Sequence, residues 1–185
     1  MVASRSPLFR SVSSSTGVRH STLVYHGVHS SMFFTGLRNG FTGFDLKNKT
    51  VKLYDDGAQP CMMTTVDSIC IAVHSILLHP EETANKALRI HDFFISQREL
   101  LTVLESFLGP FEISHISVAE EEKRLIPRIE AGEEDMGVFG ARLLTHLFGP
   151  DNSASWELED DSKLLGLPHR ELKEEVRKVV DEFRA

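Results

Sequence analysis

The feature that most constrains this chain is a repeated change from extended, β-branched stretches to helices with a capped start and an apolar stripe. Residues 51–64 are extended on both sides of Asp56-Gly57 and lead directly into apolar residues at helical spacing. Glycine accepts the positive φ that a tight hairpin needs, so the pattern predicts two short strands that pair there. Thr65 or Asp67 is expected to cap the following helix through a side-chain oxygen.

The same order of strand and helix recurs along the chain. Residues 21–28 are typical of a buried strand, and residues 86–93 and 111–118 are typical of short strands. Ser96 and Glu99 fit a capping box, in which each side chain satisfies the other residue's free backbone donor, and an apolar stripe at spacings of three and four follows. This alternation predicts α/β layering with some parallel strand pairing.

The last third of the chain has a different pattern. Residues 135–150 carry apolar side chains on one side of a helix and stop at a Gly-Pro pair. Residues 168–185 place apolar side chains at helical spacing between charged ones. We therefore expect a helical layer at the C-terminal end of an α/β fold.

Composition excludes several classes of function. The chain has 185 residues and a formal charge of −7, and its basic residues are mixed with acidic ones, which argues against a nucleic-acid surface. No apolar run approaches the roughly 18 residues of a spanning helix, so we predict no membrane segment. Cys61 and Cys70 lack the spacing of a metal pair and are interpreted as buried or partly buried thiols. A cytoplasmic location is expected.

The N-terminal stretch is the exception in charge. Residues 1–44 contain arginines but no acidic residue, and the start is rich in serine, as in a mitochondrial transit peptide. The alternative is a non-native leader, because residues 1–20 have no sustained helical stripe. In both cases we expect residues 1–20 to be a poorly ordered leader and residues 21–185 to form the folded region.

The search for a reaction centre is mostly negative. The sequence contains no Gly-x-Gly-x-x-Gly motif, no phosphate loop and no nucleophile elbow. Neither Tyr25 nor Tyr54 has a lysine four residues later, so the proton-relay pair of ordinary short-chain dehydrogenases is missing. His20, His26 and His29 could approach one metal ion, but no acidic or thiolate partner is near them in sequence. We predict no metal site.

Several blocks of the sequence carry a family resemblance. They are NGFTGFDLKNKTVKLYDDGAQP, TTVDSI, LLHPEETANKALRIHDFFISQRELL and DDSKLLGLP followed by a charged amphipathic helix. In this order they resemble the C-terminal half of NmrA-like proteins, the isoflavone-reductase-like group of atypical short-chain dehydrogenases. The resemblance extends from about Leu37 to Ala185 and implies the C-terminal part of a Rossmann-type NAD(P)-binding fold with a helical substrate region.

The resemblance also implies a cofactor and a ligand. The family uses NADP or NAD, but its glycine-rich phosphate turn and catalytic lysine belong to the N-terminal half, which this sequence lacks. Strong dinucleotide binding is therefore expected to be largely lost. Phe33 and Phe34 fall in the family's loop beside the nicotinamide and are candidate substrate-lining residues; the alternative is a hydrophobic plug under a long loop.

Three hypotheses about function follow from the resemblance. In the first, the chain derives from an NAD(P)-dependent reductase of small aromatic compounds but does not catalyse the reaction by itself. In the second, it is a non-catalytic regulatory domain in which NAD(P) occupancy governs binding to a protein partner. In the third, it is a truncated gene product with no independent role.

Overall fold

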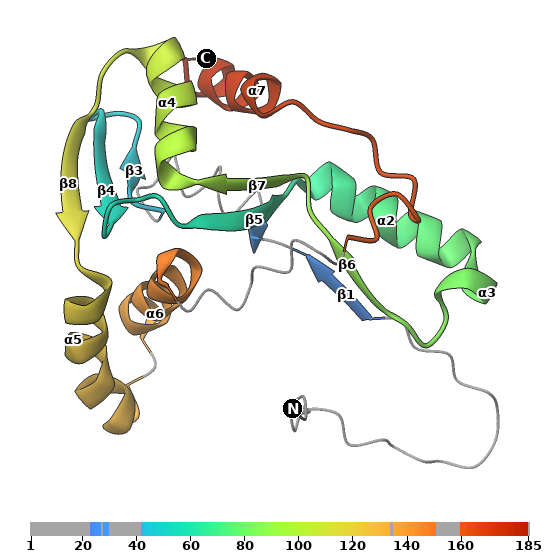
Figure 1. Cartoon of the computed structure of the whole chain (residues 1–185), viewed down its shortest axis with the longest axis horizontal. Coiled ribbons are helices and arrows are strands. Elements are labelled where there is room, and N and C mark those ends of the chain that lie inside the picture. Colours follow the sequence, from blue (N-terminus) through green and yellow to red (C-terminus); the bar gives the residue numbers. More distant parts are fainter. Residues whose placement is uncertain (1–22, 27, 30–41, 134, 151–159, 185) are drawn as a thin grey trace.

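The computed structural model describes residues 23–26, 28–29, 42–133, 135–150 and 160–184. In this part of the chain β1 to β5 come first, strands and helices then alternate from α2 to α5, and α6 and α7 follow as the predicted C-terminal helices (Figure 1). The strands are β1 (Leu23–His26), β2 (Val28–His29), β3 (Phe44–Asp45), β4 (Thr50–Tyr54), β5 (Pro60–Thr64), β6 (Ala87–Ile90), β7 (Phe93–Ser96) and β8 (Glu112–Ile116). The helices are α2 (Val66–Leu78), α3 (Pro80–Thr83), α4 (Gln97–Leu108), α5 (Val118–Glu130), α6 (Met136–Phe148) and α7 (Leu172–Arg184).

The strands form three small groups. β1 pairs in parallel with β6, and β5 lies between β2, which is parallel to it, and β7, which is antiparallel. β4 lies between β3, which is antiparallel, and β8, which is parallel. Mixed pairing of this kind with helices between the strands confirms the predicted α/β class.

The predicted hairpin between β4 and β5 is wrong. Both edges of β4 are occupied, by β3 and by β8, whose register runs from Thr50 opposite Glu112 to Tyr54 opposite Ile116. The chain does turn after Tyr54, where the Gly57 N–H donates to the Tyr54 carbonyl at 2.8 Å. It then leaves this group of strands, because β5 finds its partners in β2 and β7 instead.

The predicted capping residues do begin the helices. Thr65 accepts a hydrogen bond from the Ser68 N–H at the start of α2. At the start of α4, Ser96 accepts from the Glu99 N–H while the Glu99 carboxylate accepts from the Ser96 N–H, which completes the capping box. These local bonds satisfy backbone donors that the first turn of a helix leaves free.

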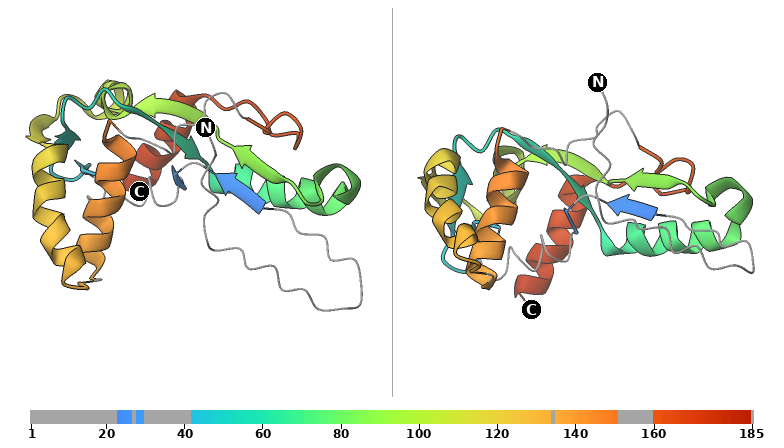
Figure 2. Two further views of the ribbon diagram at one scale, coloured as in Figure 1. Left: turned by 60° about the horizontal axis from the view of Figure 1, so that its bottom comes forward. Right: turned by 90° about the horizontal axis from the view of Figure 1, so that it is seen from below.

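Two apolar cores lie under these elements. The larger one joins α4, α6 and α7 to strands β3 to β5 and β7, and its fully buried members include Phe44, Val51, Leu100 and Leu104. The smaller one joins α2 to β6 and to Leu165. Both views of Figure 2 show α5 and α6 side by side at one end of the molecule, with α2, β1 and β6 at the other.

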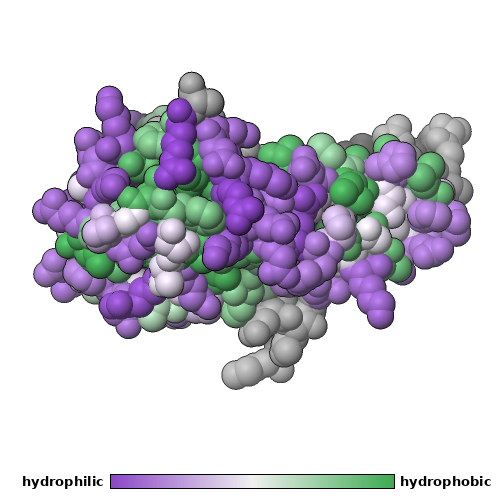
Figure 3. Space-filling view, turned by 90° about the horizontal axis from the view of Figure 1, so that it is seen from above, coloured by the Kyte–Doolittle hydropathy of each residue, from purple (hydrophilic) through white to green (hydrophobic). Residues whose placement is uncertain are grey.

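One face of the molecule mixes hydrophilic and hydrophobic residues. α4 and α7 lie at the top of Figure 1, and the view from above in Figure 3 shows hydrophilic residues interrupting the hydrophobic ones over this face. None of the helices that the structure describes is long and apolar enough to cross a membrane.

The two cysteines differ in exposure, so the prediction that both are at least partly buried is wrong for one of them. Cys61 is fully buried in β5, and burial raises the pKa of its thiol to about 12. Cys70 is exposed, because it lies on the face of α2 that points away from the smaller core. Only a thiolate attacks a disulfide reagent, so the two residues should differ in reactivity.

We therefore expect the native protein to react with Ellman's reagent at one thiol, with Cys61 at least ~100-fold slower than Cys70. Unfolding in guanidinium should release two equivalents. The measurement is the time course of absorbance at pH 8, with Cys70→Ser as the control that removes the fast phase. Two fast equivalents from the native wild type would contradict the prediction.

Candidate functional site

A groove of about 630 Å³ lies between α5 and α6 in the described structure. Both helices face it with residues at spacings of three and four, so each presents one side. The lining residues are Glu122, Leu125, Ile126 and Ile129 on α5 and Phe139, Arg142, Leu143, Thr145, His146, Gly149 and Pro150 on and after α6. Its volume is within the range of ligand pockets, roughly 300 to 1,000 Å³.

The local sequence fixes the two helices at both ends of the groove. Val118 N–H at the start of α5 donates to the Asp55 carboxylate at 3.0 Å. Asp135 caps α6 by accepting from the Gly137 and Val138 N–H groups, and this bonding, from Val138 above all, lowers the pKa of the Asp135 carboxyl. Arg128 near the end of α5 joins Asp135 to α5 through a contact of 2.7 Å.

The apolar walls of the groove are only partly used by the core. Leu125, Val138 and Leu144 are buried and hold the helices together. Ile126 and Phe139 stay 52% and 54% exposed. Exposed apolar residues that gather in a concave place indicate a binding surface more than a packing need.

A second hollow of about 460 Å³ shares Ile129, Phe139 and Arg142 with the groove. It extends the apolar surface toward the turn between the helices, where Met136 is 73% exposed. The two hollows together offer a continuous apolar strip, with the Arg142 guanidinium on its α6 side.

A buried tyrosine lies below the other end of the groove. The Tyr54 ring stacks on Phe148, with ring centroids 5.6 Å apart. Burial, with the nearby Glu121 carboxylate, raises the pKa of Tyr54 to about 12, so its hydroxyl is neutral at physiological pH. Arg124 forms two hydrogen bonds to Glu121, and this bonding lowers the pKa of that carboxyl.

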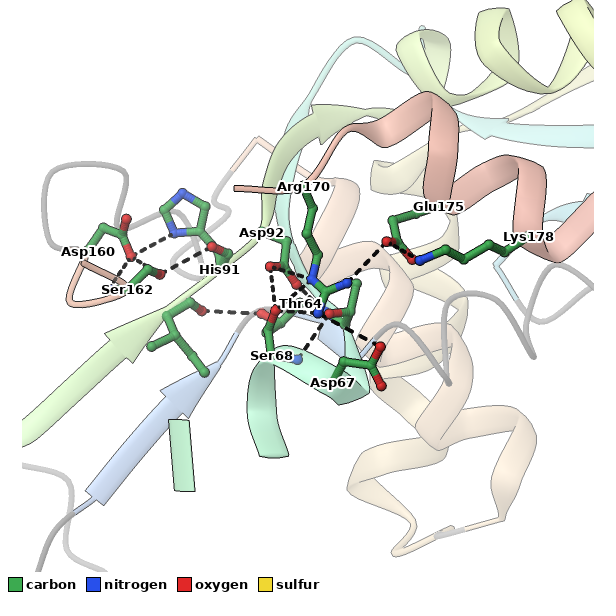
Figure 4. A network of polar contacts seen from close by, with 12 residues as sticks. Thr64, Asp67, Ser68, His91, Asp92, Asp160, Ser162, Arg170, Glu175 and Lys178 are labelled. Atoms are coloured by element: carbon green, nitrogen blue, oxygen red, sulfur yellow. Dashed lines mark hydrogen bonds and ion pairs between the residues drawn. The ribbon is translucent and has the colours of Figure 1, made fainter. Parts of the chain in front are cut away.

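A separate polar junction ties the C-terminal segment to the strands (Figure 4). The Asp92 side chain is 2% exposed and accepts from the Thr65 N–H at 2.5 Å and the Ser68 hydroxyl at 2.6 Å. The Arg170 guanidinium lies 3.6 Å from Asp92 and 3.2 Å from Glu175. Every charged group at the centre of this junction has a partner, which is typical of a structural network.

Four of the described helix starts do not fit the pyrophosphate of a dinucleotide. Phosphate binding needs free N–H groups at a helix start and glycines that a ligand can approach. The starts of α2, α4, α5 and α6 are instead bonded to the chain's own side chains. The close approaches of Gly43 and Gly149 are to the backbone carbonyls of Lys52 and Thr145, so neither leaves room for a ligand.

One group of metal-ligand types comes together among the described residues. His79, Glu81 and Glu82 lie at the turn between α2 and α3 with their ligand atoms within 4.8 Å of one another, and all three are exposed. Exposed acidic groups are common without an ion. The histidines considered from the sequence are not part of it.

The residues predicted from the sequence lie elsewhere. Phe33 and Phe34 are outside the described residues, so their role as lining residues stays a prediction. The sequence analysis did not predict a groove between α5 and α6; it placed apolar side chains on one side of the helix at residues 135–150 and assigned no stripe to α5. The signal that could have found the groove is the second set of apolar residues, Ile126, Ile129 and Phe139, on the sides of two adjacent helices.

Comparisons with known proteins agree with this architecture. No protein-family model matches the chain. Oxidoreductase poxI of Penicillium oxalicum is 27% identical over an alignment of 165 residues, which covers 80% of this chain and 51% of the relative. The chain thus spans about half the length of this relative.

The solved structures give the same proportion. Isoflavone reductase superposes with a TM-score of 0.62 at 18% identity, over 86% of this chain and 52% of that one. AtPrR2 with NADP+ and (+)pinoresinol superposes with a TM-score of 0.66 at 17% identity, over 84% and 51%. The predicted resemblance to the isoflavone-reductase-like group is therefore confirmed: the chain has the α/β fold of those proteins and is similar in sequence to fungal oxidoreductases.

Proposed function

We propose that the chain is a domain of the NAD(P)-dependent oxidoreductase type found in isoflavone reductase. We propose that it binds an aromatic small molecule in the groove between α5 and α6. The observation that carries the proposal is this groove, with apolar walls from two helices and a ligand-sized volume, on a fold shared with isoflavone reductase. The (+)pinoresinol found with AtPrR2 is a ligand of the expected kind.

The role proposed for the described residues is substrate binding, without turnover by these residues alone. In nicotinamide enzymes the cofactor supplies the hydride chemistry, and the protein supplies orientation and exclusion of water. The groove walls offer apolar contact from Ile126, Phe139 and Leu143, which suits an aromatic ring. The starts of α2, α4 and α5 are already bonded to side chains, so we expect other residues to hold the nucleotide.

The test is a titration of the purified chain with (+)pinoresinol, followed by calorimetry. We expect binding to the wild type and about tenfold weaker binding to Phe139→Ala, since truncating a half-buried aromatic contact costs about 1.4 kcal/mol. Phe183→Ala is the matched control, because Phe183 is 37% exposed on α7 and does not line the groove. Equal affinities of wild type and Phe139→Ala would refute the groove as the site.

A second arm uses NADPH. Oxidation of NADPH that depends on the aromatic compound would support a reductase. NADPH binding without oxidation would instead support the alternative, a non-catalytic NAD(P)-sensing domain that acts on a protein partner.

A further inference from the structure

One of the charged side chains that line the groove, the guanidinium of Arg142, has no ion-pair partner among the described residues. Arg142 is exposed on α6, lines both hollows, and its guanidinium makes no hydrogen bond or ion pair with any other residue that the structure describes. Two arginines of the adjacent helix α5 do have acidic partners. Arg124 is bonded to Glu121, and Arg128 to Glu133 and Asp135.

The acids nearest to Arg142 do not neutralise it. Glu133, which lines the second hollow with Arg142, is already held by Arg128 at 2.7 Å. Glu122 lines the groove from α5, but no ion pair within 4 Å joins it to Arg142 or to another residue of the described chain. Arg142 therefore presents its donors to the apolar strip without a carboxylate partner.

The side chains next to Arg142 on α6 indicate which kind of ligand group it can bind. Phe139 precedes it by one turn and His146 follows it by one turn, so an aromatic face and an imidazole flank the guanidinium on the same side of the helix. A guanidinium recognises a carboxylate through a planar pair of donors. An apolar ring against Phe139 and Ile126 could place such a carboxylate at Arg142.

We infer that the groove selects aromatic compounds that carry an anionic group, a carboxylate above all, and that Arg142 is the residue that determines this selectivity. The inference rests on the proposed function, because it names the substrate class of the same groove. Phe139, Ile126 and Ile129 hold the ring, Arg142 pairs with the anion, and Glu122 opposes anion binding from the facing helix.

The test compares two fluorescent probes of the same shape, 6-hydroxy-2-naphthoate and the neutral 6-hydroxy-2-naphthamide, by anisotropy titration of the whole chain. We expect the acid to bind wild type about five- to tenfold more tightly than the amide, as a charge-assisted pair at a partly exposed site allows. Arg142→Gln should weaken the acid more than the amide, so that the ratio of the two affinities falls to about one. The preference should also fall with added salt.

Two further variants test the sign and the position of the effect. Glu122→Gln should strengthen binding of the acid severalfold, because it removes the opposing charge from the groove wall. Lys123→Gln is the charge-matched control for Arg142→Gln, since Lys123 is exposed on α5 and does not line the groove. It should leave the ratio of the two affinities within about twofold of wild type.

Each contrary outcome has its own meaning. If acid and amide bind wild type equally, the inference is overturned while the aromatic site of the proposed function remains. If Arg142→Gln weakens both probes alike, Arg142 maintains the groove and does not select charge, which also overturns the inference. If neither probe nor (+)pinoresinol binds, the proposed function fails together with the inference.

Discussion

Replacing Asp92 with alanine should lower the free energy of unfolding by about 3 to 5 kcal/mol, the cost of removing one partner from a buried ion pair. Three groups lose their acceptor in this variant: the Thr65 N–H, the Ser68 hydroxyl and the Arg170 guanidinium. Arg170 is only 12% exposed, so water cannot replace the carboxylate fully. The measurement is urea denaturation followed by circular dichroism.

Two controls separate the charge from the position. Asp92→Asn keeps an oxygen acceptor and removes the charge, so its cost should be smaller, about 1 to 3 kcal/mol. Asp67→Asn removes a third carboxylate near Arg170, at 3.8 Å, but Asp67 is 74% exposed, so the cost should stay below about 0.5 kcal/mol. If Asp92→Ala were as mild as Asp67→Asn, the junction would not hold the C-terminal segment to the strands.

Local signals in the sequence predicted the caps of α2 and α4, whereas the helical pattern of residues 168–185 begins four residues before α7 does, at Leu172. Thr65 and Ser96 cap α2 and α4 because each bond joins residues that are three positions apart. The apolar stripe of α6 was likewise predicted from spacing alone. Bonds of this range depend only on the residues of one segment, so the sequence of that segment contains the information.

Pairing between distant segments could not be predicted in the same way. The hairpin between β4 and β5 satisfied every local rule, but β8 takes the edge of β4 that the hairpin needed. The Asp92 junction has the same character, since it joins β6 and β7 through their connection to Arg170 in the C-terminal segment. Neither Asp92 nor Arg170 belongs to a sequence motif, and only the fold brings these two residues together.

The groove is intermediate between these cases. The amphipathic pattern of α5 and α6 is visible in the sequence, but whether Ile126 and Phe139 face a core or an open hollow depends on how far apart the helices pack. A sequence pattern specifies which residues share a helix face and not what that face meets. The unpaired state of Arg142 in the described chain is likewise a property of its surroundings.

Gln97 is a second residue whose importance depends on distant contacts. It occupies the first position of α4 and is fully buried. Its Oε1 accepts from the Tyr54 N–H at 2.9 Å, and its Nε2 donates to the carbonyls of Thr42 and Lys52 at 3.4 and 3.3 Å. One amide thus joins the start of α4 to β4 and to the segment before β3.

Replacing Gln97 with leucine should therefore cost about 2 to 4 kcal/mol of unfolding free energy, because a side chain of similar size leaves these buried backbone groups without their partner. Gln59→Leu makes the same chemical change at a partly buried site and should cost less than about 1 kcal/mol.

Gln97→Glu keeps an acceptor for Tyr54 but turns a second oxygen toward two carbonyls. Burial and these carbonyls should raise the pKa of the new carboxyl above its value of about 4.3 in the unfolded chain. The deficit of Gln97→Glu relative to wild type should therefore be smallest below about pH 4 and grow as the pH rises. A deficit that did not change with pH, together with a stable Gln97→Leu variant, would show that the amide is not needed for the junction between α4 and β4.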